Sequence, residues 1–376
     1  MKKIIIITIL AVFTISNISW AAPKEKDDKN LIQLAILLDS SSSMSGLINQ
    51  AKSQIWKIVN ELALAQRDGK SPDIEVGLYE YGKSTIPSSE GYLRMLVPLS
   101  TDLDRVSDEL FKITTNGGNE YCGQVIKVAA ESLKWSKSNK ALKVIVIAGN
   151  EPFTQGSVDY KKACKDAISK GIIVNTIFCG DERTGINTKW KDGADLADGK
   201  YMAIDHTKKV VHIEAPQDDE ILKLGGDLNK TYIGYGRKGR ANKERQVAQD
   251  ANASKMSKSV MVQRSFTKSS KKYKNTKWDL VDAVENEELK VEEVKKTDLP
   301  KEMQKMNKKE RKQYVEKKSK ERSVLQKKIA ALKKERDAYV LKERKKRAGK
   351  DKGTLDSAIV NAIKNQAMKK EFKFEK

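Results

Sequence analysis

The stretch LAILLDSSSSMSGL, residues 34–47, decides the fold that we expect for this chain. Its apolar residues run without interruption to Asp39, and four serines follow directly. A continuous apolar run indicates a strand that is buried on both faces, as in a parallel sheet. The next segment, 46–66, repeats apolar residues at helical spacing. A buried strand, a short polar loop and an amphipathic helix therefore open the domain.

The same alternation of strand-like and helix-like segments continues as far as about Ile213. We expect strands at 31–38, 74–82, 92–100, 142–149, 172–180 and 200–205, and helices at 46–66, 101–113, 123–135 and 158–171. Pro98 places 92–100 at an edge of the sheet, because proline has no N–H for a central ladder. Such alternation predicts an α/β fold with a doubly wound, mostly parallel sheet over residues 30–213. Ligands bind these sheets at the carboxyl ends of the strands, where Asp39 and its serines lie.

Residues 1–21 have the pattern of a signal peptide. Lys2 and Lys3 form a positive end, an apolar stretch follows, and small residues stand at Ser19 and Ala21. We therefore expect a protein that is exported, either periplasmic or secreted. An uncleaved leader that anchors the protein in a membrane is the alternative, although the apolar stretch is short for a spanning helix.

The part of the chain after residue 213 is rich in basic residues. The whole chain has 376 residues and a formal net charge of +22, and residues 301–350 hold 21 Lys or Arg against 7 Asp or Glu. Residues 214–290 show almost no apolar periodicity, so we interpret them as a basic linker or a loosely ordered arm. Residues 291–376 are expected to form a mainly α-helical, basic C-terminal tail.

Within this tail, one set of residues steps at heptad spacing: Leu325, Ile329, Leu332, Arg336 and Tyr339. The spacing is typical of a coiled-coil seam, here interrupted by an arginine. A helical hairpin, or a helix docked on the globular domain, fits the same pattern. A further amphipathic helix is expected at 354–368, with Thr354 as its cap.

The serines after Asp39 have the spacing of a metal-binding loop. Asp39, Ser41 and Ser43 are each two residues apart, so their side chains can converge in a tight loop. One carboxylate and two hydroxyls suit a hard cation, Mg²⁺ or Mn²⁺, and suit Ca²⁺ less well. The alternative is that Ser43 or Ser45 only caps the helix that follows.

The strand, the Asp-x-Ser-x-Ser loop and the helix together resemble the opening of the von Willebrand factor type A (VWA) domain. TTNGGNEYCG (114–123) stands where that family has its second metal loop, and VIVIAGNEP (144–152) stands where it has the third. The resemblance covers about residues 31–213. It implies a Rossmann-like sheet with a metal-ion-dependent adhesion site (MIDAS) at its top. With its basic helical tail, the chain also resembles a set of exported bacterial VWA proteins.

Carried over residue by residue, the resemblance implies a modified site. The first loop matches without change, but the threonine of the second loop falls on Asn119, beside Glu120, and the aspartate of the third falls on Gly149. A Glu120 that reached the ion would lower the affinity for an external acidic ligand, and the missing carboxylate at 149 should weaken cation binding. The implied metal residues are Asp39, Ser41, Ser43, Asn119, Glu120 and Asn150.

Three cysteines, Cys122, Cys164 and Cys179, allow one disulfide and one free thiol, or three buried small side chains. Cys122 starts a predicted helix, where the helix dipole lowers a thiol pKa. A thiol nucleophile needs a base, and the two histidines, His206 and His212, are placed near the far edge of the sheet. The sequence contains no Gly-x-Ser-x-Gly, His-Glu-x-x-His or P-loop pattern, so we do not expect an enzyme.

The basic tail would attract anionic surfaces. For an exported protein we expect anionic lipid or an envelope polymer rather than nucleic acid, also because Tyr314 and Tyr339 are too isolated to form a stacking surface.

Three functions follow as hypotheses: an exported interaction module that binds an unknown protein or envelope ligand with a divalent ion, an envelope scaffold with a vestigial metal site that acts through its tail, and a thiol enzyme centred on Cys122. The oligomeric state stays open, with the heptad seam as one route to a dimer.

Overall fold

The N-terminal half of the protein is built on one sheet. The computed structural model describes residues 30–45, 47–62, 65–204, 213–270, 273–347 and 355–374. Six strands lie in the order β4-β3-β1-β5-β6-β7, and all neighbours are parallel except β3 and β4. Their bounds are β1 (Leu31–Asp39), β3 (Asp73–Tyr81), β4 (Leu93–Ser100), β5 (Leu142–Gly149), β6 (Ile172–Phe178) and β7 (Tyr201–Ala203).

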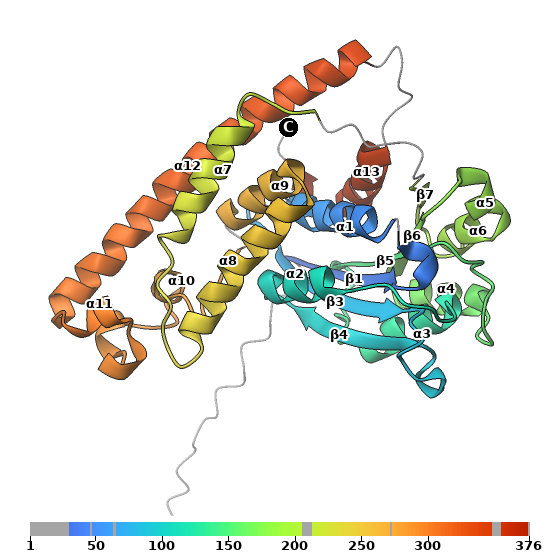
Figure 1. Ribbon diagram of the computed structural model, residues 1–376, viewed down its shortest axis with the longest axis horizontal. Helices are drawn as coiled ribbons and strands as arrows, with labels where there is room; N and C mark the ends of the chain where they lie inside the picture. The colour runs from blue at the N-terminus through green and yellow to red at the C-terminus, as the bar shows by residue number, and fades with distance from the viewer. Residues whose placement is uncertain are drawn as a thin grey trace, which may run out of the picture.

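Helices cover both faces of this sheet (Figure 1). On one face, α1 (Ile48–Leu62) and α2 (Leu103–Lys112) pack against the even-numbered side chains of β1, such as Ile36 and Leu38. On the other face, α3 (Cys122–Ser132), α4 (Tyr160–Ser169) and α6 (Trp190–Asp195) pack against the odd-numbered ones, such as Leu37. Every residue of β1 is buried. The doubly wound α/β prediction is confirmed, and the continuous apolar run has its cause in this two-sided burial.

Local sequence features explain several boundaries of these elements. The antiparallel strand β4 lies at the edge of the sheet and contains Pro98. Gly171 ends α4 with a φ of +72°, a conformation that glycine adopts without strain. The side chain of Asp102 caps α2 by accepting a hydrogen bond from the backbone N–H of Arg105 at 3.0 Å.

The segment 214–290 was expected to be a linker or a loosely ordered arm, and that interpretation is wrong. It forms α7 (Asp218–Asn229), α8 (Gly239–Met256), α9 (Lys258–Ser269) and α10 (Leu280–Glu285). In these helices, buried charges replace part of the apolar stripe: Arg264 of α9 lies 2.6 Å from Asp104 of α2 and 3.0 Å from Asp250 of α8. Helices whose buried face is polar lack the apolar periodicity by which helices are found in a sequence.

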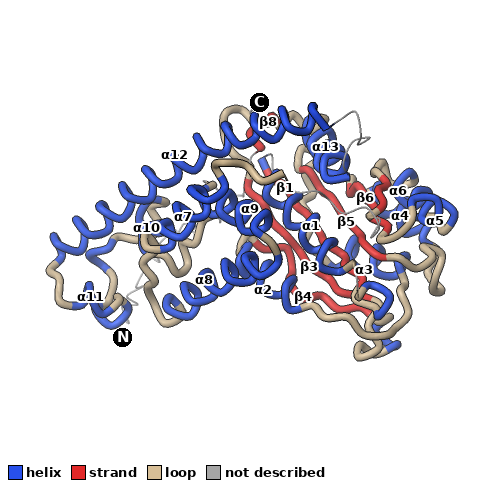
Figure 2. The backbone as a smooth tube through the Cα atoms, turned by 45° about the horizontal axis from the view of Figure 1, so that its top comes forward, coloured by secondary structure: helices blue, strands red, loops and turns tan. Residues whose placement is uncertain are grey.

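The heptad seam in α12 (Lys308–Arg347) is covered by the same chain. Ile329 is fully buried, and Leu325 and Leu332 pack against the cluster formed mainly by α7 and α9. Arg336 pairs with Asp218 of α7 at 2.6 Å. Figure 2 shows α12 lying along the outside of this helical part. The seam therefore docks α12 on α7 and α9, which belong to the segment 214–290 and not to the globular domain on which a docked helix was expected.

The chain then returns to the sheet. Helix α13 (Leu355–Met368) packs against α1, and Val360, Ile363, Ala367 and Phe372 join the core on that face. The remaining elements are β2 (Ala65–Gln66) with its antiparallel partner β8 (Lys373–Phe374), α5 (Glu182–Asn187), α11 (Lys301–Gln304) and the short 3₁₀ turns η2 (Ser42–Met44), η3 (Ser88–Glu90), η4 (Val291–Glu293) and η5 (Lys296–Asp298).

Some expectations fall on residues that the structure does not describe. These are the leader 1–21, the two histidines at 206 and 212, and the helix cap at Thr354. Of the helices in the described part of the chain, none combines the length and the apolar character needed to cross a bilayer.

Candidate metal centre

Five of the six expected metal residues lie together at the carboxyl end of the sheet. We call them the strand-end cluster: Asp39, Ser41, Ser43, Glu120 and Asn150. They come from the ends of β1 and β5 and from the loop before α3. Because β1 lies between β3 and β5, the connections that leave β1 and β5 run to opposite sides of the sheet at this point. Open α/β sheets bind ligands at such a point.

The first loop holds its oxygen atoms close to one another. The backbone N–H of Ser41 donates to Asp39 Oδ1 at 2.8 Å, and the hydroxyl oxygens of Ser41 and Ser43 are 2.8 Å apart. The Ser43 hydroxyl donates to Asn150 Oδ1 at 2.9 Å, which joins the first loop to the third. The spacing of two residues thus brings the side chains together, as the sequence indicated. Ser45, by contrast, donates to the carbonyl oxygen of Ser42 at 2.6 Å.

The second loop presents Glu120 rather than Asn119 to the cluster. Glu120 is buried and its carboxyl accepts a hydrogen bond from Ser41, whereas Asn119 is exposed. Gly82, with a φ of +79°, leaves the space in which the side chain of Glu120 comes close to Asp39. A Cβ atom at this position would lie 2.8 Å from both Asp39 Oδ1 and Glu120 Cγ.

The third loop has no room for the aspartate of the VWA pattern. A Cβ atom at Gly149 would lie 2.6 Å from the Tyr81 hydroxyl and 3.0 Å from Asp39 Oδ2. The Tyr81 hydroxyl, which donates to the carbonyl oxygen of Ala148 at 3.1 Å, fills that space. Tyr81 was not among the expected site residues; the signal for it was a tyrosine in the last position of the strand that pairs with β1.

Burial dominates the electrostatics of the two carboxyl groups. It raises the pKa of Asp39 to about 7, and the nearby charge of Glu120 adds to the shift. Burial also raises the pKa of Glu120 to about 7, with a contribution from the charge of Glu151. Asp39 Oδ2 is buried and has no hydrogen-bond partner. A buried carboxylate oxygen without a partner is costly, and a cation beside it would remove that cost.

The donor set fits a hard divalent cation. It consists of carboxylate, hydroxyl and amide oxygens, which Mg²⁺ and Mn²⁺ prefer. It contains only two carboxylates, however. Across the described ranges, no group of three or more His, Cys, Asp or Glu side chains is placed to hold a metal. Ion binding here would therefore depend on the serine hydroxyls and Asn150 as well as on the acids.

The three cysteines lie in the interior of the sheet domain. Cys122, Cys164 and Cys179 are free thiols and all three are buried. Burial raises the pKa of Cys122 well above its ordinary value, although this residue is the first of α3. The expected lowering by the helix dipole is wrong, because loss of hydration outweighs it at a fully buried sulfur. The pKa of Cys164 is likewise raised, to about 12. The disulfide alternative is not realised.

Comparison with protein families gives one match: residues 33–189 fit the model of the von Willebrand factor type A domain. A search of curated proteins gave no match.

Solved structures that resemble the chain include a conserved hypothetical protein BatB from Bacteroides thetaiotaomicron, with 17% identity over 46% of this chain and 90% of that one, at a TM-score of 0.36. The VWA domain of SpRpn10 has 16% identity over 48% of this chain and 91% of that one, at a TM-score of 0.37. Proximal thread matrix protein 1 from the mussel byssus, with a zinc-occupied MIDAS motif, has 11% identity over 49% of this chain and 44% of that one, at a TM-score of 0.35.

Proposed function

Because residues 33–189 form a von Willebrand factor type A domain, we propose that this protein is an interaction module that binds a protein ligand at its strand-end cluster with the help of a divalent cation. The observation that carries the proposal is the buried Asp39 Oδ2, which has no hydrogen-bond partner among a set of converging oxygen atoms. Asp39, Ser41, Ser43 and Glu120 would hold the ion, with Asn150 positioning Ser43. Mg²⁺ or Mn²⁺ is the expected species.

Glu120 sets the kind of ligand that we expect. An ion held by this internal carboxylate has less affinity for a carboxylate of a partner protein, because part of its charge is already neutralised. The exposed Asn119 beside it offers an amide for a neutral contact. We therefore propose a ligand that is recognised through several polar contacts around the cluster rather than through one acidic side chain.

Thermal unfolding of the purified chain tests the metal proposal. A bound ion stabilises the native state by about 2.7 kcal/mol at 100 times its Kd, so Mg²⁺ or Mn²⁺ should raise the Tm and a chelator should reverse the rise. Ser43→Ala should abolish most of this response. Ser42→Ala is the matched control, because Ser42 is an exposed neighbouring serine outside the cluster. No response to any divalent ion, or an equal response in the two variants, would refute the proposal.

We further propose that the protein acts outside the cytoplasm, on the basis of the leader pattern in residues 1–21. N-terminal sequencing of the mature protein from a fractionated cell should then begin just after Ala21. A mature chain that retains Lys2 and Lys3 in the membrane fraction would support the anchored alternative instead.

A second role rests on the outward face of α12. Its inner side is occupied by α7 and α9, while Lys309, Lys312 and Lys327 are exposed. We propose that this face contacts an anionic envelope surface. Replacing these three lysines by glutamine should reduce binding to anionic envelope fractions at low salt, and unchanged binding would count against this role.

A further inference from the structure

A cavity of about 720 Å³ opens at the end of β5 opposite to the strand-end cluster. We call it the lysine pocket, after the lysines that line it: Lys134, Lys137, Lys143, Lys170 and Lys370. Lys134 and Lys137 come from the loop between α3 and β5, Lys143 from β5, and Lys170 from the end of α4. Lys370 is supplied by the segment after α13, so the pocket is complete only when the C-terminal part of the chain has returned to the sheet.

The positive charges in this pocket are not neutralised by acids. None of the described residues that line it carries a carboxylate. The Lys143 ammonium donates to the backbone carbonyl oxygens of Ser136 at 3.1 Å and Lys170 at 2.6 Å. Lys370 donates to the carbonyl oxygen of Asn139 at 2.7 Å. Carbonyl oxygens bear partial charges only, so most of the positive charge of the lysines stays uncompensated.

The nearest acidic neighbour along the chain is already engaged. Glu371 follows Lys370 and pairs with Arg67 at 2.6 Å. The pKa of Lys143 lies below its ordinary value because the side chain is buried and because the charge of Lys370 is close. The lowered pKa of Lys143 indicates that like charges are held together here at a cost. An anion in the cavity would remove that cost.

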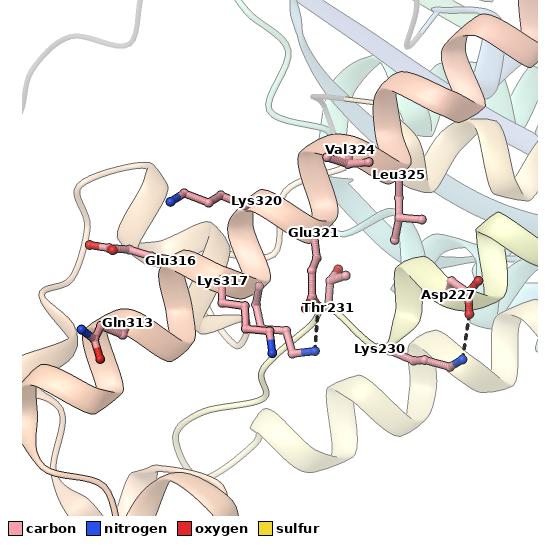
Figure 3. A pocket seen from close by; sticks show the side chains of 11 residues that line it. Asp227, Lys230, Thr231, Gln313, Glu316, Lys317, Lys320, Glu321, Val324 and Leu325 are labelled. Carbon is pink, nitrogen blue, oxygen red and sulfur yellow. Dashed lines mark hydrogen bonds and ion pairs between the residues drawn. The ribbon is translucent and has the colours of Figure 1, made fainter.

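The larger cavity between α7 and α12 shows the contrast (Figure 3). It has a volume of about 860 Å³ and is also lined by lysines. There, however, Lys230 pairs with Asp227 at 2.7 Å and Lys318 pairs with Glu321 at 2.8 Å. Because acids alternate with the lysines, that cavity does not concentrate charge of one sign. The lysine pocket is distinguished by its lack of such partners, not by its size.

The walls of the lysine pocket favour a phosphorylated ligand. Lysine ammonium groups bind phosphate as point charges, and the described lining of the cavity contains five lysines and no carboxylate. Several lysines entering from separate segments match an anion whose oxygens point in several directions. Trp135 forms an apolar wall and is fixed by a hydrogen bond from its Nε1–H to the carbonyl oxygen of Ala129 at 3.0 Å. The volume lies within the range of small-molecule sites.

We propose that the lysine pocket binds an anion that carries two or more phosphoryl groups, with any organic part of the ligand against Trp135. The ligand is either a soluble phosphorylated compound or the headgroup of a lipid. This site is separate from the strand-end cluster and does not require a divalent ion there.

Calorimetric titration of the full-length chain with sodium pyrophosphate tests the proposal. The wild type should bind pyrophosphate more tightly than inorganic phosphate, and affinity should fall with rising salt. The triple variant Lys134→Gln, Lys137→Gln, Lys370→Gln should bind about tenfold more weakly or worse, because three nearby charges are lost. The control triple variant Lys255→Gln, Lys295→Gln, Lys305→Gln removes the same charge from exposed positions outside both cavities and outside the outward face of α12, and it should keep the wild-type affinity within about twofold.

Sedimentation with vesicles of phosphatidylcholine, with and without a phosphorylated phosphoinositide, assigns the source of the ligand. Vesicle binding that is lost only in the pocket variant supports a lipid headgroup, and pyrophosphate binding without vesicle binding supports a soluble compound. The proposal is overturned if the wild type does not bind pyrophosphate, or if the two triple variants, both shown to be folded by thermal unfolding, lose affinity equally.

Discussion

Replacing Phe372 by alanine should destabilise the N-terminal sheet domain, although this residue lies near the opposite end of the chain. Its side chain is 1% exposed and packs in the core together with α1. The guanidinium of Arg67 lies 5.1 Å from the centre of its ring. Truncation of a buried phenylalanine costs about 3–5 kcal/mol. Because single domains are stable by about 5–15 kcal/mol, this is a large part of the total.

Urea unfolding followed by tryptophan fluorescence measures this effect, because Trp56 and Trp190 are buried in the domain. Met368→Ala is the matched control. Met368 ends α13 but is 51% exposed, so its replacement should change the free energy of unfolding by less than about 0.5 kcal/mol. If Phe372→Ala cost no more than this control, the C-terminal segment would not be part of the domain core, and our account of the fold would fail.

Two further predictions concern the strand-end cluster. Gly149→Asp, which restores the VWA pattern, should not strengthen ion binding and should lower the Tm, because its Cβ would lie 2.6 Å from the Tyr81 hydroxyl; a variant with a higher Tm in Mg²⁺ would contradict this reading. Without divalent ions, the free energy of unfolding should fall as the pH rises from about 4 to about 7. The pKa of Asp39 is about 7 in the folded state, so over this window the folded state binds more protons than the unfolded state. Asp39→Asn should flatten this slope by up to about 1.4 kcal/mol per pH unit, and an unchanged slope would show that Asp39 does not titrate there.

The α/β half of the fold was predictable because its elements carry local signals. The apolar run of β1 and the edge proline of β4 both appear in the structure as expected. In this half, burial of apolar side chains drives the packing, and such burial leaves a period in the sequence.

The site was predictable only in part. The two-residue spacing of Asp39, Ser41 and Ser43 was enough to expect their convergence, which the structure contains. The choice between Asn119 and Glu120 was not predictable, because it depends on the space left by Gly82, which directly follows β3. The role of Tyr81 beside Gly149 likewise depends on how β1 lies between β3 and β5.

By itself, the sequence determined the doubly wound domain, the loop that follows β1 and the basic character of the rest. Only the tertiary structure decided that residues 214–290 fold, that the heptad seam of α12 faces its own chain and that Phe372 belongs to the sheet core. The physical reason is the same in each case. These contacts join residues far apart in the chain, so no local pattern says which partner each surface meets. In residues 214–290 they include buried ion pairs such as Arg264 with Asp104, which leave no periodic mark in either partner's local sequence.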